Sequence, residues 1–389
     1  MRTHTVKLGE VAVVKGGKRL PKGVGLITTP NSHPYIRVRD LNGKCPLELN
    51  NTFEFVDDNT QVTISKYTVN SGDIVLSIVG TIGLVSIVGS SLNRANLTEN
   101  CVKLTALPNI DRNFLYYFLK SPYGQQKIAQ GTVGAVQAKL PIKNIQNIEI
   151  NLPDIKIQKK IASILSSLDN KIFVNDNIND NLADLLQTIY QERFGNDILA
   201  VNQGVLSDIC SYSRDKVAVS ELNVITYFST ENMLSGKAGS TEATSLPTTS
   251  QTTACHKGDT LISNIRPYFK KIVYCEDKCG CSTDVLCFTP SQPCYSAYLF
   301  STLYADKFFA FMVAGSKGTK MPRGDKQQIM TYPVVLPSEE ELAGFNTIAS
   351  PLLEQIYSNR AENKRLSILR DTLLPKLMSG EINVSAVQL

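Results

Sequence analysis

The sequence lacks several features that define large classes of enzyme. It contains no tryptophan and only three histidines in 389 residues, at His4, His33 and His256. None of these histidines stands in a catalytic triad or at a metal-ligand spacing. No GxxxxGK[ST] phosphate loop is present, because the run Lys15-Gly-Gly-Lys18 lacks both the spacing and the hydroxyl residue. We therefore expect no catalytic residues, no metal and no cofactor in this chain.

Long apolar runs and a disulfide pattern are also missing. The longest uncharged apolar stretch, residues 74–88, is shorter than the roughly 18 residues that a membrane span needs. Gly80 and Gly83 near its centre predict instead a hairpin of two buried strands. The N-terminus MRTHTVKLGE has no secretion signal, and nine cysteines are an odd number. These observations predict a cytoplasmic protein with reduced thiols and no membrane contact.

What the sequence does contain is an internal repeat. The string SGDIVLS, with Gly72-Asp73, recurs as KGDTLIS, with Gly258-Asp259, and further on residues 131–194 align without gaps with residues 315–378. A register kept over that length is not expected by chance. We interpret the chain as two copies of one unit, each a variable globular part followed by a more similar tail.

Both tails are predicted to be long helices. Pro153-Asp154 and Pro337-Ser338 each place an N-cap residue after a proline, and Ser338 forms a capping box with Glu341. Apolar residues recur every seven positions at Ile161, Leu168, Leu182 and Ile189, and at Phe345, Leu352, Leu366 and Leu373. This repeat indicates a coiled-coil seam in which each helix is the other's partner. Pro351 predicts a kink or a late start of the second helix.

One asparagine in each helix, Asn175 and Asn359, falls on a seam position near the middle of the helix. In an antiparallel pair only the midpoints of two equivalent helices meet. We therefore predict that the helices are antiparallel and that the two asparagines face each other and fix the register. The alternative is that both asparagines are solvated in an Asn-rich helix.

The positive charge lies in the globular parts. Residues 1–153 carry a net charge of +7 and residues 195–337 carry +1, whereas the helical segments 154–194 and 338–389 carry −1 and −2. Basic residues gather in Gly-rich, turn-like sequence, which suits contact with DNA phosphates and base edges. The candidate DNA-binding residues are Lys15, Lys18, Arg19, Lys22, Arg37, Arg39, Lys139, Lys143, Arg266, Tyr268, Lys270, Lys271, Lys317, Lys320, Arg323 and Lys326.

Two other residue groups have both a chemical and a structural interpretation. Glu276-Asp-Lys278, with Asp259 upstream, could end a nuclease signature, but Asp73 in the first copy has no equivalent partners. The cysteines between Cys275 and Cys294 include no Cys-x2-Cys pair. Buried thiols on strands are therefore favoured over a structural zinc site, although the sequence leaves the zinc open.

The order of the motifs resembles that of a known family. KLGEVAVVKGG, YIRVRDL, SGDIVLSIVGTIG, GTVGAVQAKLPIKNIQNIEINLP and QKKIASILSSLDNKI in the first half, with GSKGTKMPRGDKQQI and DTLLPKLMSGEI in the second, are similar to DNA specificity subunits of type I restriction-modification systems. The resemblance covers essentially the whole chain, including its doubled arrangement. Each motif alone is weak, and their order and repetition carry the assignment.

The resemblance implies an α+β fold of two pseudo-twofold-related α/β target recognition domains separated by two long helices packed as an antiparallel coiled coil. The implied domains are recognition domains at 1–153 and 195–337 and conserved helices at 154–194 and 338–389. It implies a reader without catalytic activity, whose partners are double-stranded DNA, two modification (methyltransferase) subunits and, in the full complex, restriction and motor subunits. From the residues alone, a scaffold that joins two protein-binding domains stays open as the alternative.

Overall fold

The computed structural model describes residues 3–41, 45–134, 137–195 and 202–385. The chain divides into two compact units, one made of Met1–Asn175 with Glu362–Leu389 and the other of Asp176–Ala361. The sequence repeat predicts a boundary at the end of each helix. In the structure each unit instead contains one globular part and about half of each long helix, because the helix halves pack against the globular part beside them.

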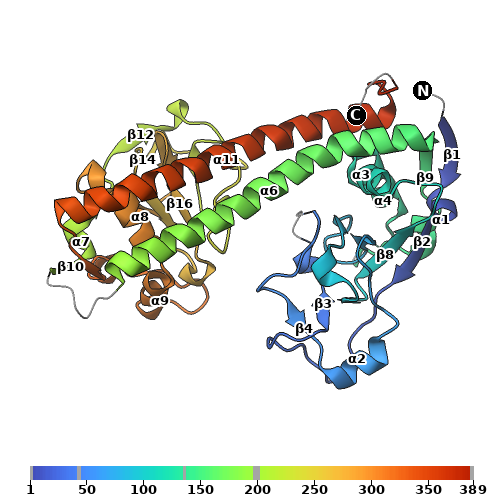
Figure 1. Ribbon diagram of the computed structural model, residues 1–389, viewed down its shortest axis with the longest axis horizontal. Coiled ribbons are helices and arrows are strands. Elements are labelled where there is room, and N and C mark those ends of the chain that lie inside the picture. Colours follow the sequence, from blue (N-terminus) through green and yellow to red (C-terminus); the bar gives the residue numbers. More distant parts are fainter. Residues whose placement is uncertain (1–2, 42–44, 135–136, 196–201, 386–389) are drawn as a thin grey trace. The chain divides into compact units, whose positions relative to one another are not determined.

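The described part of the first unit contains three sheets, the smallest being the pair β1-β9, together with short helices (Figure 1). Its elements are β1 (Thr3–Lys7), α1 (Leu8–Val11), β2 (Ala12–Gly16), β3 (Pro34–Ile36), β4 (Glu54–Phe55), α2 (Asp58–Ile64), β5 (Ile74–Ser77), β6 (Val85–Ile87), β7 (Asn96–Leu97), β8 (Cys101–Ala106), α3 (Arg112–Lys120), α4 (Pro122–Gly131), α5 (Ile142–Gln146) and β9 (Glu149–Pro153). The strands β2-β8-β5-β6 form an antiparallel sheet, and β4-β3-β7 form a smaller one.

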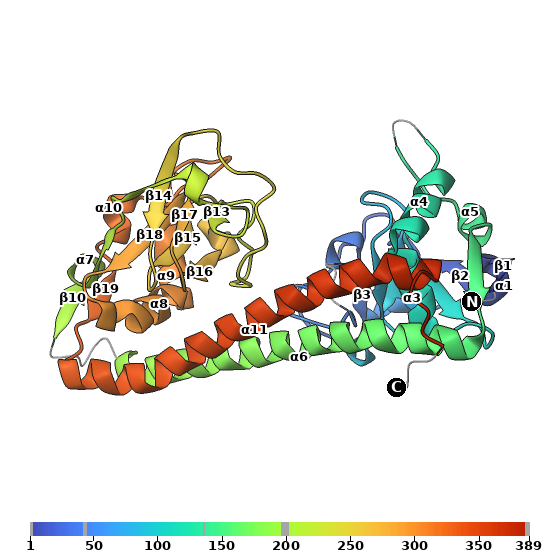
Figure 2. The ribbon, with the colours of Figure 1, turned by 90° about the horizontal axis from the view of Figure 1, so that it is seen from above.

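The second unit repeats most of this order, with strand β14 where the first unit has helix α2 (Figure 2). Its elements are β10 (Gln203–Val205), α7 (Leu206–Ile209), β11 (Cys210–Tyr212), β12 (Lys216–Ala218), β13 (Tyr227–Phe228), β14 (Gln251–Cys255), β15 (Thr260–Ser263), β16 (Ile272–Tyr274), β17 (Cys279–Cys281), β18 (Val285–Pro290), α8 (Ser296–Tyr304), α9 (Asp306–Ala314), α10 (Lys326–Ile329) and β19 (Pro333–Val335). The sheet β11-β18-β15-β16 has the same order and antiparallel pairing as β2-β8-β5-β6. The repeat inferred from sequence is thus a repeat of topology.

The predicted hairpin within residues 74–88 is confirmed. Strand β5 pairs antiparallel with β6, and the four residues of β5 are buried. The corresponding strands of the second unit, β15 and β16, pair in the same way. Among the described residues, no helix has both the length and the apolar composition that membrane crossing requires.

The two long helices are α6 (Ile155–Phe194) and α11 (Glu339–Ser379). Their predicted caps are confirmed: Asp154 Oδ1 accepts from the Lys156 N–H at 2.8 Å, and Ser338 and Glu341 bond each other in a capping box. Within each unit the halves of α6 and α11 lie side by side and run in opposite directions (Figures 1 and 2). The helix α11 runs through Pro351 without interruption, so the expected late start is wrong.

The pairing predicted for Asn175 and Asn359 is wrong. Both asparagines lie on the buried seam, but Asn175 Nδ2 donates to Asn363 Oδ1 at 2.9 Å in the first unit, and Asn359 Nδ2 donates to Asn179 Oδ1 at 2.9 Å in the second. Each helix carries two asparagines four residues apart, and reversal of direction brings the first of one helix to the second of the other. The centre of the antiparallel contact therefore lies two residues further along each helix than the prediction from Asn175 and Asn359 placed it.

One continuous core holds the first globular part to its helices. Its buried residues come from the β2-β8-β5-β6 sheet, from α3 and from both long helices. The helix α3 begins where the Asp111 carboxylate accepts from the Phe114 N–H at 2.9 Å, and six of its residues are buried. The second unit has an equivalent core around α8, α9 and the other halves of the long helices.

Candidate nucleic-acid interface

Both units hold a basic hairpin loop against the end of the β5 or β15 strand. In the first unit Lys139 pairs through its backbone with both Val133 and Val79. In the second unit Arg323 pairs in the same way with Lys317 and Ile265. The Gly-rich strings GTVGAVQAK and GSKGTKMPR are thus equivalent hairpins in space, which places basic residues at the same position of each domain.

A groove of about 360 Å³ lies beside this region in the first unit. Its lining includes Lys15 on β2, and also Lys66, Tyr67 and Lys103. The Nζ of Lys18 lies 5.5 Å from the centre of the Tyr67 ring, a distance that allows cation–π attraction. An exposed aromatic ring among several lysines is a combination that fits DNA contact.

Sequence reasoning found only part of this groove. Lys66 and Tyr67 follow α2 and carry no basic or Gly-rich signature, so nothing in the local sequence marks them. Lys103 lies on β8, and its Nζ is 3.3 Å from Asp73 and donates to the Thr68 carbonyl at 2.8 Å. Lys103 therefore acts mainly within the fold, whereas Lys15 and Lys66 have no ion pair among the described residues.

The remaining candidates of the first unit are spread over its surface. Arg19 is exposed and forms an ion pair with Glu99 at 2.6 Å, and that hydrogen bond raises the pKa of its guanidinium. Lys22, Lys139 and Lys143 are exposed, and none has an ion pair within the described ranges. These three lysines are consistent with phosphate contact and do not form a cluster with a defined ligand geometry.

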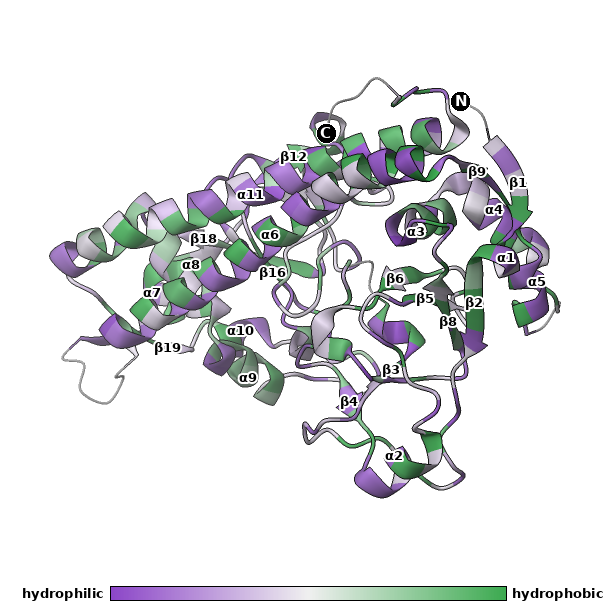
Figure 3. Cartoon of the chain, turned by 45° about the vertical axis from the view of Figure 1, so that its right-hand side comes forward, coloured by the Kyte–Doolittle hydropathy of each residue, from purple (hydrophilic) through white to green (hydrophobic). Residues whose placement is uncertain are grey.

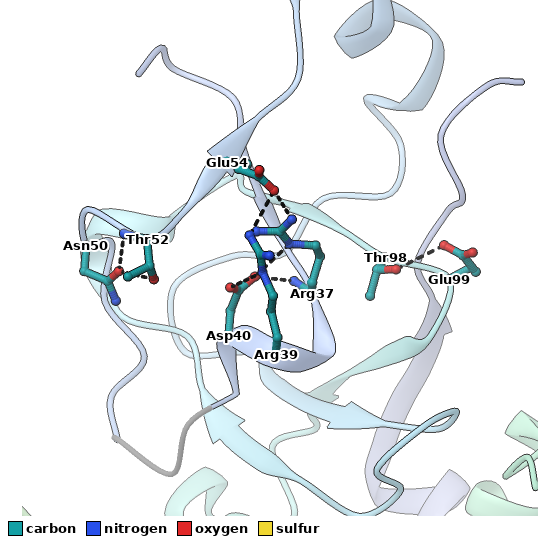
Figure 4. Close-up of polar contacts among 8 residues, drawn as sticks. All are labelled: Arg37, Arg39, Asp40, Asn50, Thr52, Glu54, Thr98 and Glu99. Atoms are coloured by element: carbon teal, nitrogen blue, oxygen red, sulfur yellow. Dashed lines mark hydrogen bonds and ion pairs between the residues drawn. The ribbon is translucent and has the colours of Figure 1, made fainter. Parts of the chain in front are cut away.

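Arg37 and Arg39 converge on an acidic pair rather than on open solvent (Figure 4). Both guanidinium groups bond the Glu54 carboxylate, that of Arg39 at 2.9 Å, and both lie near Asp40. The β3–β4 pairing causes this, because it sets Tyr35 opposite Glu54. Burial raises the pKa of Asp40, and the neighbouring arginines oppose that shift. Arg37 is mostly buried and holds the fold, whereas the Arg39 side chain is 59% exposed.

The second unit has a wider cleft of about 650 Å³. Its lining includes two cations, Arg266 and Lys271, and two carboxylates, Glu231 and Asp284, together with hydroxyl groups such as that of Ser282. Lys271 Nζ donates to the Thr230 carbonyl, and burial lowers the pKa of Lys271. The cleft therefore offers both donors and acceptors, unlike a purely basic phosphate site.

The other basic candidates of the second unit surround this cleft. Arg323 pairs with Asp284 at 3.0 Å, Lys317 with Asp325 at 2.6 Å and Lys270 with Asp306 at 3.0 Å. Lys320 and Lys326 are exposed and have no described ion pair. Tyr268 is 50% exposed and packs on Phe269, with ring centres 4.8 Å apart. The two units thus use different arrangements at equivalent positions.

The cysteines of the second unit gather in a buried cluster. Cys255, Cys275, Cys279, Cys281 and Cys287 share one apolar core, and Cys275 and Cys279 have their Sγ atoms 3.5 Å apart. Cys294 is exposed and lies outside this core. Within the residues that the structure describes, no group of three or more His, Cys, Asp or Glu side chains is arranged to hold a metal.

The residues of the possible nuclease signature do not come together. Asp259 is fully buried, where its carboxylate accepts from the His256 N–H at 2.8 Å. Lys278 points elsewhere and pairs with Glu221 at 2.8 Å. A nuclease site needs these groups at one point, so this arrangement gives no support to that interpretation.

The long helices expose apolar side chains outside their seam. Leu185 on α6 and its repeat equivalent Leu369 on α11 are 47% and 46% exposed. Val174, Ile178 and Ile368 are also exposed, and Figure 3 shows hydrophobic stretches alternating with hydrophilic ones along both helices. Apolar residues exposed at equivalent positions of a repeat are typical of surfaces that bind equivalent partners.

Comparison with known proteins gives this arrangement its context. Residues 3–183 match the family model of the type I restriction modification DNA specificity domain. The type I restriction enzyme MjaIX specificity subunit of Methanocaldococcus jannaschii is 34% identical over 73 residues, which cover 19% of this chain and 17% of that protein. The EcoBI specificity subunit of Escherichia coli is 24% identical over 218 residues, covering 54% and 43%. The chain thus matches less than half the length of either relative.

The fold likeness extends over almost the whole chain. The S subunit of a type I restriction-modification system from M. genitalium superposes with a TM-score of 0.57 at 19% identity, covering 97% of this chain and 96% of that one. The matched domain lies within residues 3–183, and the fold of nearly the whole chain, with its two similar units, is similar to that of this S subunit. The chain is HsdS-like, that is, similar to the specificity subunits of type I restriction-modification systems.

Proposed function

We propose that this protein is the DNA specificity subunit of a type I restriction-modification complex, in which each unit reads one half of a bipartite sequence in double-stranded DNA. The observation that carries the proposal is the repetition of topology. The unit that contains the matched specificity domain has the same sheet order and the same basic hairpin as the second unit. Two similar modules in one chain suit the reading of two half-sites.

In this proposal the recognition domains are residues 1–153 and 195–337, and the helices at 154–194 and 338–389 set the distance between half-sites. The chain itself is a reader in the cytoplasm without catalytic residues or cofactor. Adenine methylation belongs to two modification subunits, and restriction subunits complete the complex. The exposed Leu185 and Leu369 support two equivalent docking positions on the helices.

The direct test is co-expression of the full chain with a type I methyltransferase subunit, followed by mapping of methylated adenines in genomic DNA. We expect one bipartite motif with a fixed spacer, which disappears when the chain is omitted. A methyltransferase that gives no such motif in the presence of the chain overturns the proposal. A chain that instead retains other protein partners through both globular parts would favour a scaffold.

The half-sites can be assigned by matched surface variants. Replacing Lys15, Lys18 and Lys66 by alanine should weaken reading through the first unit, and replacing Lys320 and Lys326 should weaken reading through the second. Each set removes phosphate contacts, so DNA binding should weaken and its dependence on salt concentration should become less steep. Loss of both half-sites from either set would contradict two independent readers.

The role of the helices has a length test. One heptad inserted into each helix beside the paired asparagines adds about 10 Å at 1.5 Å per residue. Because DNA rises about 3.4 Å per base pair, the spacer should lengthen by about three base pairs while both half-sites stay unchanged. An unchanged spacer would show that the helices do not set it.

A further inference from the structure

The turn between the central strands has two left-handed residues at corresponding ends in both units, although the second turn is one residue longer and the residues differ. In the first unit the β5–β6 turn has left-handed φ values at Gly80 (+79°) and Gly83 (+92°). In the second unit the β15–β16 turn has left-handed φ values at Arg266 (+50°) and Lys270 (+51°). The positions correspond in their distance from paired strand residues. Gly80 and Arg266 each stand four residues after a paired residue of the first strand, Leu76 or Ile262. Gly83 and Lys270 each stand two residues before the partner of that residue on the second strand.

Glycine is the residue that fits this conformation without strain. A residue with a Cβ atom is strained in the left-handed region, and non-glycine residues there concentrate at functional sites. The glycine solution is available to this fold, since the first unit uses it at both positions. The two cations of the second unit therefore need a reason other than the geometry of the turn.

Lys270 has such a reason within the protein. Its Nζ lies 3.0 Å from Asp306, which also pairs with Lys237 at 2.7 Å. These lysines lower the pKa of the Asp306 carboxyl, chiefly through the Lys237 hydrogen bond. The strained position of Lys270 thus serves a contact between the turn and α9.

Arg266 has no comparable partner. Its guanidinium makes no described hydrogen bond or ion pair, and its Nε is buried without an acceptor. The backbone is fixed on both sides, because the Arg266 N–H donates to the Pro322 carbonyl and its carbonyl accepts from the Phe269 N–H. The Nε atom is out of a ligand's reach, but the two terminal amino groups are not among the buried unpaired atoms and have no described partner. They can therefore donate to an acceptor that a ligand brings.

The surroundings of Arg266 favour a base edge over a phosphate. The cleft that it lines also contains the exposed carboxylate of Glu231, which repels a phosphate and can accept from base amino groups, and that of Asp284, which is already paired with Arg323. The exposed Lys320 and Lys326 lie outside the lining of this cleft. Arginine most often pairs through its two terminal amino groups with O6 and N7 of guanine.

We infer that Arg266 is a specificity-determining residue of the second unit, which donates to a guanine edge in its half-site and is held for that contact by a strained turn. The inference rests on the proposed function and adds to it a residue and a base.

The test maps methylated adenines in genomic DNA from cells that express the full complex with Arg266→Gly, Arg266→Lys or Lys237→Gly. Arg266→Gly restores the residue that the turn prefers, so the melting temperature of the protein should stay equal or rise. Discrimination at one guanine position of one half-site should fall by roughly 5- to 150-fold. Arg266→Lys keeps the charge but loses the planar fork, so it should relax the same position.

The other outcomes are separable. Lys237→Gly relieves the strain of another left-handed residue of the second unit, at φ +65°, and should leave the motif unchanged, although it also removes a contact with Asp306. If Arg266→Gly leaves the motif intact, or lowers methylation at every site by the same factor as a lost phosphate contact would, the inference is wrong while the proposed function stands. If the unmodified chain yields no bipartite motif, the proposed function fails, and this inference fails with it.

Discussion

The two units attach their globular parts to the long helices with different chemistry. In the first unit Tyr117 donates to Asp169 at 2.7 Å, and Arg370 pairs with the other carboxylate oxygen of Asp169 at 2.6 Å. The repeat-equivalent residues of the second unit are Ser301, Leu353 and Leu186. There four aromatic rings, Tyr190, Phe194, Tyr298 and Phe345, pack with centres 4.9–6.4 Å apart.

Both units therefore use corresponding positions to hold the long helices, but the first holds them through polar contacts and the second through aromatic packing. The four aromatic positions of the second unit correspond to Leu374, Met378, Phe114 and Ile161 of the first, which lie in or against its core. A smaller apolar contact in the first unit thus occurs together with a polar network. The variants below test whether the two solutions are interchangeable.

The largest effect is expected at Phe345, which is fully buried and contacts three of the other rings. Phe345→Ala should lower the free energy of unfolding by about 3–5 kcal/mol, because it removes a large side chain and leaves a cavity. Denaturant titration with hydrogen exchange should place the loss in the second unit. The matched variant is Ile161→Ala, which should lose less and act on the first unit.

Breaking the network of Tyr117, Asp169 and Arg370 should lower the free energy of unfolding more than replacing its ion pair by apolar residues. Arg370→Leu alone leaves the mostly buried Asp169 carboxylate without its cation and should destabilise by about 2–4 kcal/mol. Burial, which alone would lower the pKa of Arg370, is outweighed by hydrogen bonds to Asp371 and Asp169, so its net pKa is raised. Arg370→Leu with Asp169→Leu imports the residues of the second unit and should cost less than either single change. A double-mutant cycle measures this, and simple additivity would contradict it.

The buried carboxylates Asp73 and Asp259 form a second equivalent pair. Asp73 accepts from Thr105 at 2.6 Å and pairs with Lys103, whereas Asp259 has the Cys287 thiol at 3.2 Å instead of the lysine. Asp73→Asn should cost about 1–3 kcal/mol, because Lys103 loses its carboxylate. Asp259→Asn keeps an acceptor for the His256 N–H and should cost less. Equal losses would contradict the importance of the lysine.

The same pair should differ in pH dependence. Burial raises the pKa of Asp259 above the ordinary carboxyl value. The folded state then holds a proton that the unfolded chain has released, so stability is highest below the ordinary value and falls as pH rises towards the folded pKa. Asp259→Asn should remove this slope from unfolding measured across acidic pH, and an unchanged slope would assign it to another group.

The smallest effect concerns the asparagines of the seam. Replacing Asn179 and Asn359 together by leucine should raise stability by roughly 1 kcal/mol, since a polar pair then becomes apolar. Either single change should destabilise, because it leaves a buried amide without its partner. Asn175 also donates to Glu362 at 2.7 Å, so the equivalent pair in the first unit should gain less. Calorimetry on the full chain compares the four variants.

Much of the fold follows from local sequence. The repeat predicts two units, and the strings SGDIVLS and KGDTLIS predict the central strands. The heptads, with the caps Asp154 and Ser338, predict the two long helices. These features were predictable because they depend on periodicity and caps, which are local. The seam partners were not, because a pairing error of one turn changes no local pattern.

The candidate interface was less predictable. Arg37 and Arg39 have the sequence of a basic loop, but pairing of β3 with β4 brings Glu54 to them from a distant part of the chain. Lys66 and Tyr67 reach the groove through tertiary packing alone. A basic string shows that cations are present, and only the fold decides which of them already have an acidic partner.

The paired asparagines are self-complementary. A helix with asparagines four residues apart, placed against a reversed copy of itself, makes two identical hydrogen bonds, as Asn175 with Asn363 and Asn179 with Asn359 do here. Nothing in that contact requires the two helices to belong to one polypeptide. Two separate half-length chains, each with one globular part and one such helix, would satisfy it equally. Under the proposed function they would read a palindrome, where a single chain with two different globular parts would read two different half-sites.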